Sequence, residues 1–266
     1  MTLFAAHRGG AALWPENSLL AFKNALALGS PLVELDVHAT ADGDAAVIHD
    51  PTLDRTSNGS GPVRAKTADE LRRVRLKAPA GGGLTDEGVP MLRDVLTIAA
   101  PTPVAVLVEI KTPGQAVTFE RRDAGVSSVP GARYPGLERR VLDDLRETRM
   151  TERAMVMAFN PAVIAEVRTL APSMRTVLLM DRQARDAGLA GDAVVAQATR
   201  AGVSFIGIHH SLCDAAVVTA ARRAGLGIGV FTVNDENAMR RLVELGVDVI
   251  ISDRPDLVAR VERGAR

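Results

Sequence analysis

The chain has 266 residues, of which 47% are hydrophobic and only 3% aromatic, so an aliphatic core must hold it together. It carries 32 basic and 32 acidic residues, and this balance gives no long-range attraction to nucleic acid or to anionic membranes. The single cysteine, Cys213, excludes an intrachain disulfide and fits a reducing compartment. Neither a signal peptide nor a stretch long enough to span a membrane is visible, so we expect a cytoplasmic protein.

Short apolar runs alternate with amphipathic stretches along most of the chain. This alternation of strand and helix is typical of an α/β fold with parallel strands. The predicted strands are Leu3–His7, Leu32–Val37, Ala45–His49, Val104–Ile110, Ala154–Phe159, Thr176–Met180, Phe205–Ile208, Ile228–Val233 and Val247–Ser252. The predicted helices are Asn17–Leu28, Leu137–Glu147, Pro161–Leu170, Ala187–Ala201, Ala215–Ala224 and Glu236–Leu245. We expect N-caps at Asn17, Asn160 and Asn234.

Nine strands are one more than an eight-stranded barrel contains. The run Ala45–His49 is joined to the strand before it by residues 40–44, a connection too short for a parallel crossover, and Asp42-Gly43 predicts a hairpin turn. We therefore expect residues 34–49 to form a barrel strand that continues into an antiparallel arm, which brings His49 near Asp36. The predicted fold is a TIM (β/α)8 barrel with a β-hairpin arm, formed by residues 1–266 as a single domain.

Two stretches interrupt the alternation. Residues 58–88 are rich in glycine and charge, with one short helical pattern at Ala68–Arg75, and residues 112–136 have no clear period. Both follow strands at the end of a barrel where its chemistry takes place. We interpret them as loop insertions at the catalytic face.

Acidic side chains on two predicted strands should point into the barrel. Alternation places Glu34 and Asp36 on one face of their strand, and by the same argument Glu109 and Lys111 face inward from theirs. An edge position or a buried ion pair is the alternative for each strand taken alone. Two carboxylates about 5 Å apart repel by roughly 3 kcal/mol at an effective dielectric of about 20. Lys111 alone would leave three of them net negative, so the pattern favours a divalent cation such as Mg²⁺ or Ca²⁺.

Two of the five histidines, His7 and His49, each end a predicted strand beside polar residues. On neighbouring strands that flank the carboxylates, they would form a general acid/base pair that titrates near neutral pH. Arg8 and Lys111 add the cationic groups that bind phosphate oxygens. Together these residues predict a metal-dependent site that cleaves a small phosphodiester.

The remaining histidines have a simpler interpretation. His38 lies on the predicted arm, and His209 and His210 follow another strand. We interpret all three as structural or solvated.

Seven short motifs follow one another along residues 7–256. They are His7-Arg8-Gly9, Pro15-Glu16-Asn17-Ser18, Glu34-Leu35-Asp36-Val37, the octapeptide of residues 49–56, Glu109-Ile110-Lys111, Phe231-Thr232-Val233-Asn234 and the heptapeptide of residues 250–256. Each is weak alone, but the ordered set resembles the glycerophosphodiester phosphodiesterases. The resemblance implies a TIM barrel, metal-dependent hydrolysis of glycerophosphodiesters to glycerol phosphate and an alcohol, and a small-molecule substrate.

The resemblance also implies a role for each matching residue. A divalent ion, Mg²⁺ or Ca²⁺, would be bound by three carboxylates, and two histidines would act as acid and base. The implied metal ligands are Glu34, Asp36 and Glu109, the implied catalytic pair is His7 and His49, and the implied substrate-binding residues are Arg8, Lys111, Glu16 and Phe231. Glu16 is expected to orient Arg8.

Three positions depart from the family pattern. Phe231 stands where many members have tryptophan, Ala158 where a serine is common, and Ser18 where threonine is usual. None of them belongs to the implied metal or acid/base residues. Since the aromatic position is expected to line the pocket for the alcohol, these departures bear on substrate preference.

Other functions remain as alternatives. A lysophospholipase D-type enzyme would share the site but would need an apolar rim or a basic amphipathic helix. A Schiff-base lyase would use Lys111 but leave the carboxylates and histidines unexplained. A non-catalytic barrel that binds a phosphate ligand is a further alternative. The sequence gives no signal for nucleic-acid binding, a membrane span or a particular oligomeric state.

Overall fold

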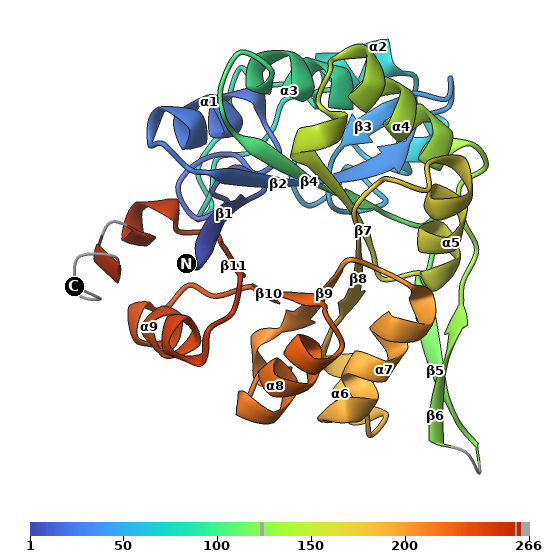
Figure 1. Ribbon diagram of the computed structural model, residues 1–266. Coiled ribbons are helices and arrows are strands. Elements are labelled where there is room, and N and C mark those ends of the chain that lie inside the picture. The colour runs from blue at the N-terminus through green and yellow to red at the C-terminus, as the bar shows by residue number, and fades with distance from the viewer. Residues whose placement is uncertain (123–124, 259, 262–266) are drawn as a thin grey trace.

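The computed structural model describes residues 1–122, 125–258 and 260–261. In these residues eight parallel strands close into a barrel, and the helices surround it (Figure 1). The barrel strands are β1 (Leu3–His7), β2 (Leu32–Ala39), β4 (Ala105–Ile110), β7 (Ala154–Ala158), β8 (Thr176–Met180), β9 (Phe205–His209), β10 (Gly227–Phe231) and β11 (Val249–Ser252). Strand β1 pairs with both β2 and β11, which closes the ring, and the predicted TIM barrel is confirmed.

The predicted arm is present at the end of β2. Strand β3 (Ala45–Val47) runs antiparallel to β2, with Val37 opposite Val47. One residue further, the Ile48 amide donates to the Asp36 carbonyl at 3.0 Å. His49 therefore follows directly beside Asp36, as the hairpin turn predicts.

The helices of the described residues alternate with the strands. They are α1 (Leu19–Ala27), α2 (Ala68–Arg73), α3 (Leu92–Ala99), α4 (Leu137–Glu147), α5 (Pro161–Leu170), α6 (Arg182–Asp186), α7 (Asp192–Ala201), α8 (Ala215–Arg223) and α9 (Glu236–Leu245). None of the helices in this part of the chain combines the length and apolar character needed to cross a membrane.

Two of the three predicted N-caps were wrong. The hydroxyl of Ser18 caps α1 and the carboxylate of Asp235 caps α9, whereas Asn160 caps α5 as expected. The misplaced asparagines have other partners, because the amide of Asn17 donates to Asp36 at 2.9 Å and that of Asn234 donates to an aspartate after β11.

The boundaries of some predicted elements also need correction. The helix predicted from residue 187 begins at Asp192, because Gly188 and Gly191 have positive φ angles of 95° and 53° and separate α6 from α7. Helix α3 was not predicted. It has only eight residues and follows the glycine-rich insertion, so its period was hidden.

The stretch 112–136, expected to be irregular, contains an antiparallel hairpin of β5 (Val117–Arg122) and β6 (Gly125–Pro130); residues 123–124 lie outside the described part. Figure 1 shows this hairpin outside the helix layer, and the Gln197 side chain of α7 donates to the Val126 carbonyl at 2.9 Å. Most side chains of β6 are half-buried, and this weak contrast between faces explains why no strand period was visible.

The insertion that follows β3 builds a small core of its own. Buried side chains gather there apart from the barrel, and a capping box of Thr67 and Glu70 begins α2. The core consists of Ala46, Ile48, Leu53, Val63, Ala68, Leu71, Leu76, Val89 and Met91. This packing gives the glycine-rich stretch a fixed shape.

The barrel interior is apolar except near the carboxyl ends of the strands. Alternate residues of each strand either face the helices or fill the barrel. The buried interior cluster is Ala5, Leu32, Leu107, Met157, Val177, Leu179, Val249 and Ile251. Polar side chains that follow these positions therefore collect at one mouth of the barrel.

Candidate active site

The three predicted metal ligands converge at that mouth. Strand register sets Asp36 beside Glu109 and His7 beside Glu34. One carboxylate oxygen from each of Glu34, Asp36 and Glu109 lies within 4.8 Å of the others, and all three residues are buried. They converge because all three occupy the alternate positions of β2 and β4 whose side chains face the barrel interior.

Two cations face this carboxylate cluster. Lys111 Nζ lies 2.9 Å from Asp36 Oδ1 and 2.6 Å from Glu109 Oε1. Arg8 Nε lies 3.3 Å from Asp36 Oδ2, and the backbone amide of Arg8 donates to Glu34 Oε2 at 3.1 Å. With all five groups ionised, the cluster has one negative charge in excess.

The burial and crowding of the carboxylates separate their pKa values. Burial raises the pKa of Glu34 well above its usual value, and repulsion from Asp36 and Glu109 adds to the effect. Burial likewise raises the pKa of Glu109, although Lys111 opposes the shift. For Asp36 burial acts in the same direction, but attraction to Lys111 and Arg8 outweighs it and the pKa falls well below the usual range.

The residues present fit a divalent cation. Asp36 Oδ1, Glu34 and Glu109 are buried together, and the two nearby cationic side chains leave the three carboxylates with one negative charge in excess. Three carboxylate oxygens are hard ligands of the kind that Mg²⁺ and Ca²⁺ prefer. A cation would balance the excess negative charge and relieve the repulsion that raises the pKa of Glu34.

His7 is held by a carboxylate from the other end of the chain. Its Nδ1 lies 2.6 Å from Asp253 Oδ1, while its Nε2 lies 3.8 Å from Glu34 Oε2. Asn234 donates to Asp253 Oδ2 at 2.6 Å and so fixes that carboxylate. Sequence reasoning assigned Asp253 no role; the available signal was its position directly after the last strand, which neighbours β1.

His49 has a similar carboxylate partner. Its Nδ1 lies 2.8 Å from Asp50 Oδ1, which leaves Nε2 as the ring nitrogen without that contact. Burial lowers the pKa of His49 to about 4, since attraction to Asp36 does not compensate for burial and the nearby Lys111.

The predicted substrate-binding residue Glu16 lies between two arginines. Its Oε1 accepts from Arg8 at 3.0 Å, and Arg55 reaches both of its oxygens at 2.8 and 2.9 Å. The expectation that Glu16 orients Arg8 agrees with this contact. Arg55, which sequence reasoning did not single out, also donates to Asp50.

His38 has a structural role, as predicted. Its Nδ1 lies 2.9 Å from the Tyr134 hydroxyl and its Nε2 lies 3.0 Å from the His49 carbonyl oxygen. Burial lowers the pKa of His38 to about 4, so this ring is neutral near pH 7. It supports the backbone of His49.

Phe231 lies at the mouth on the side away from the carboxylates. It is the last residue of β10 and pairs with His209 of β9. Strand β9 lies opposite β2 in the barrel, four strands away in either direction. Its ring contacts Phe159 edge-on, with centroids 5.9 Å apart, and His209 at 6.3 Å. His209 also accepts from Arg182 at 3.2 Å. The predicted contact of Phe231 with substrate stays a prediction.

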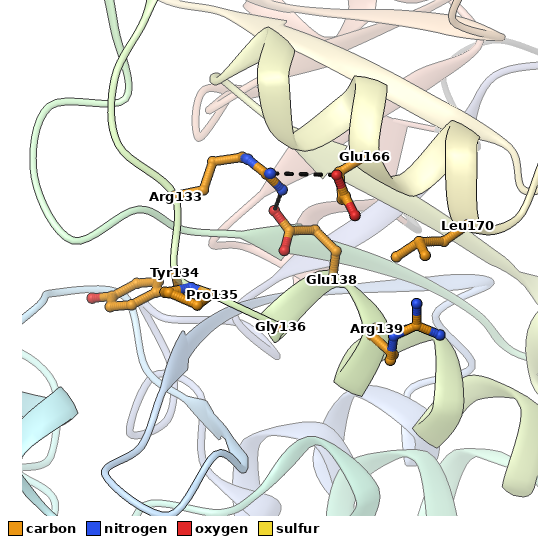
Figure 2. Close-up of a pocket in the computed structure, with 8 residues that line it drawn as sticks. All are labelled: Arg133, Tyr134, Pro135, Gly136, Glu138, Arg139, Glu166 and Leu170. Atoms are coloured by element: carbon orange, nitrogen blue, oxygen red, sulfur yellow. Dashed lines mark hydrogen bonds and ion pairs between the residues drawn. The ribbon is translucent and has the colours of Figure 1, made fainter.

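A cavity of about 360 Å³ lies elsewhere, beside the start of α4 and along α5 (Figure 2). Arg133 crosses it and pairs with Glu138 at 2.8 Å and Glu166 at 3.3 Å. Its charged groups thus largely satisfy one another, and it contains none of the predicted site residues.

Comparisons with known proteins show which family the chain resembles. Residues 7–257 match the model of the Glycerophosphoryl diester phosphodiesterase family. The chain is 30% identical over 262 residues to a glycerophosphodiester phosphodiesterase of Caldanaerobacter subterraneus subsp. tengcongensis, with 98% of both chains covered.

Solved structures share the fold over the whole chain. A putative glycerophosphoryl diester phosphodiesterase from Agrobacterium tumefaciens superposes with a TM-score of 0.83 at 26% identity, covering 100% of both chains. A phosphodiesterase from Oleispira antarctica, solved in complex with the product sn-glycerol-3-phosphate, has the same fold at 22% identity, with a TM-score of 0.78 and coverage of 99% and 97%. The chain belongs to the glycerophosphoryl diester phosphodiesterase family of enzymes.

Proposed function

We propose that this enzyme hydrolyses glycerophosphodiesters to glycerol phosphate and an alcohol, with His7 and His49 as general acid and base. The observation that carries the proposal is the pair of carboxylate–histidine contacts on either side of the carboxylate cluster. Contact at Nδ1 favours the tautomer and orientation in which Nε2 is free for proton transfer. The names of the relatives and the product bound to the Oleispira protein support the same substrate class.

The cation site in this proposal consists of Glu34, Asp36 and Glu109, with Mg²⁺ or Ca²⁺ as the ion. The ion, when bound, would stabilise negative charge on the phosphoryl oxygens. Arg8 offers a planar guanidinium to the same oxygens and Lys111 a point charge. Glu16 serves this step by orienting Arg8.

Proton transfer is divided between the two histidines. One takes the proton of the attacking hydroxyl, and the other donates a proton to the departing alkoxide, which is a poor leaving group without it. The attacking hydroxyl is either water or the neighbouring hydroxyl of the glycerol, which would give a cyclic phosphate first. Oxygen-18 tracing combined with a search for cyclic phosphate separates these routes.

The proposal extends to the domain organisation, the class of substrate and the cellular location. Residues 1–266, eight of which lie outside the described part, act as one catalytic domain with insertions at 58–88 and 112–136. The substrate is a small molecule rather than nucleic acid, and the enzyme works in the cytoplasm. These statements rest on the balanced charge, the single cysteine and the apolar barrel interior.

A substrate panel tests the proposal. Glycerophosphocholine, glycerophosphoethanolamine, glycerophosphoglycerol and lysolipids are each assayed after chelation and again with added Mg²⁺ or Ca²⁺. We expect release of glycerol phosphate from the water-soluble diesters, lost on chelation and restored by metal. Turnover of lysolipids alone would indicate a lysophospholipase D, and phosphate binding without turnover would indicate a non-catalytic barrel.

A further inference from the structure

Arg55 joins the two halves of the active site. On one side its Nε donates to Asp50 Oδ2 at 2.6 Å, and Asp50 in turn contacts His49 Nδ1. On the other side its terminal nitrogens donate to both oxygens of Glu16, which binds Arg8. A continuous chain of charge-assisted contacts thus runs from the histidine to the arginine.

These contacts are too exposed to contribute much to the stability of the fold. The Arg55 side chain is 49% exposed, and ion pairs at exposed positions contribute little to the free energy of unfolding. Their geometry is nevertheless specific, since one guanidinium meets two carboxylates at once. Hydrogen bonds with Glu16 and Asp50 raise the pKa of Arg55, and the bond from Arg55 lowers that of Asp50, so the charges that make these contacts persist near neutral pH.

The insertion after β3 fixes the backbone that carries Arg55. Leu53 is buried in the small core of the insertion. From the same insertion, Lys77 Nζ donates to the carbonyl oxygens of Asp54 and Arg55 at 2.9 and 3.1 Å. The small core and this lysine therefore determine where the guanidinium lies.

We propose that Arg55 is a positioning residue that aligns His49 and Arg8 with each other across the bound phosphodiester, and that the insertion 58–88 serves to place it. This inference rests on the proposed function, because it assigns proton transfer to His49 and phosphate binding to Arg8. A planar guanidinium suits the task, since its five N–H donors reach two carboxylates at fixed angles, whereas an ammonium offers no such fork.

The first test replaces Arg55 by alanine and measures kcat, KM and the affinity for glycerol 3-phosphate. We expect kcat/KM to fall about 10²-fold, the scale of a catalytic group displaced by about 1 Å, with kcat lowered and KM raised. Arg75→Ala is the matched control, because Arg75 is an exposed arginine of the insertion 58–88. The thermal midpoint of Arg55→Ala should stay near that of the wild type.

The second test asks whether the effect passes through both carboxylates. Asp50→Asn and Glu16→Gln should each lower kcat/KM in the wild type but have little further effect in Arg55→Ala, since the link is already broken. Arg55→Lys should recover only a small part of the loss. A cavity of about 330 Å³ borders Arg55 and Glu16, so added methylguanidinium should restore part of the rate of Arg55→Ala, which a purely structural defect would not permit.

The position of Lys77 supplies a third variant. Lys77→Met removes the donor to the two carbonyl oxygens and leaves every proposed catalytic side chain in place. We expect a kcat/KM loss in the same direction as that of Arg55→Ala, and no further loss when the two changes are combined.

Failure of this inference differs from failure of the proposed function. If His49→Ala and Arg8→Ala lose activity while Arg55→Ala stays within about twofold of the wild type, the positioning role is wrong and the proposed site stands. Full additivity of Asp50→Asn and Glu16→Gln with Arg55→Ala would also overturn it. If His49→Ala and Arg8→Ala are themselves fully active, the proposed function fails first.

Discussion

His7 and Asp253 are 246 positions apart in sequence, yet His7 Nδ1 lies 2.6 Å from Asp253 Oδ1. Closure of the barrel makes this contact, because β1 pairs with β11 and places Ala6 beside Ser252. The carboxylate holds the ring with Nε2 toward Glu34, at 3.8 Å. The Asp253 carboxylate therefore holds the His7 ring in one orientation and favours the tautomer with the proton on Nδ1.

Replacing Asp253 by asparagine should therefore lower kcat by at least about 10²-fold, the usual scale of general acid/base assistance, because the amide no longer fixes the tautomer and orientation of the His7 ring. The measurement is turnover of a glycerophosphodiester at saturating metal. Asp256→Asn is the control, since that carboxylate binds Arg254 and not a histidine. A normal kcat in Asp253→Asn would show that the contact has no part in proton transfer.

The two proposed proton-transfer residues make a second prediction. His7→Ala and His49→Ala should each reduce kcat by about 10²-fold or more, while binding of glycerol 3-phosphate stays nearly unchanged. Calorimetry measures the binding, and an enzyme-coupled assay of the released glycerol phosphate measures the turnover. His210→Ala is the control, because this half-buried ring is outside the proposed site. Wild-type turnover in either purified variant would reject the role of that histidine.

The strand alternation alone was enough to predict the carboxylate cluster. Glu34, Asp36 and Glu109 alternate with aliphatic residues that pack against the helices. A strand buried on both faces is usually apolar throughout, so the acidic residues at the inward positions made the alternation visible. The hairpin turn at Asp42-Gly43 likewise placed His49, because a tight turn fixes the register of the strands that it joins.

The contacts around this cluster could not be predicted in the same way. Asp253 meets His7 only through barrel closure, and Arg55 meets Glu16 only because the insertion folds around its own core. Both contacts depend on packing between segments that are distant in sequence. The local periodicity of hydrophobic residues carries no information about such packing. The hairpin of β5 and β6 was missed for a different reason, since the half-buried side chains of β6 give little contrast between its two faces.

Metal binding can be followed through stability, independently of turnover. A ligand at a hundred times its dissociation constant stabilises the folded state by about 2.7 kcal/mol, so Mg²⁺ or Ca²⁺ should raise the thermal midpoint of the wild type. Glu34→Gln should lose most of this increase. Without metal, the variant should be at least as stable as the wild type, because it lacks the carboxylate whose pKa burial and repulsion raise.

Glu244→Gln provides the comparison for that experiment, since Glu244 is an exposed carboxylate of α9 away from the cluster. It should retain the full metal-dependent increase. An equal increase in Glu34→Gln would place the cation elsewhere, and no increase in any of the three proteins would argue against a cation site in the barrel.

Packing inside the barrel gives the last prediction. Gly227 faces the interior on β10, and a Cβ atom there would overlap the ring of Phe205 on β9. Gly227→Ala should therefore lower the free energy of unfolding by about 1–3 kcal/mol, the usual cost of overpacking. Adding Phe205→Leu should recover part of the loss. Gly83→Ala is the control, because a Cβ atom added there would meet no atom within 4 Å. Its free energy of unfolding in urea should stay within about 0.5 kcal/mol of the wild-type value. Equal midpoints for Gly227→Ala and the wild type would mean that the aromatic ring moves aside without cost.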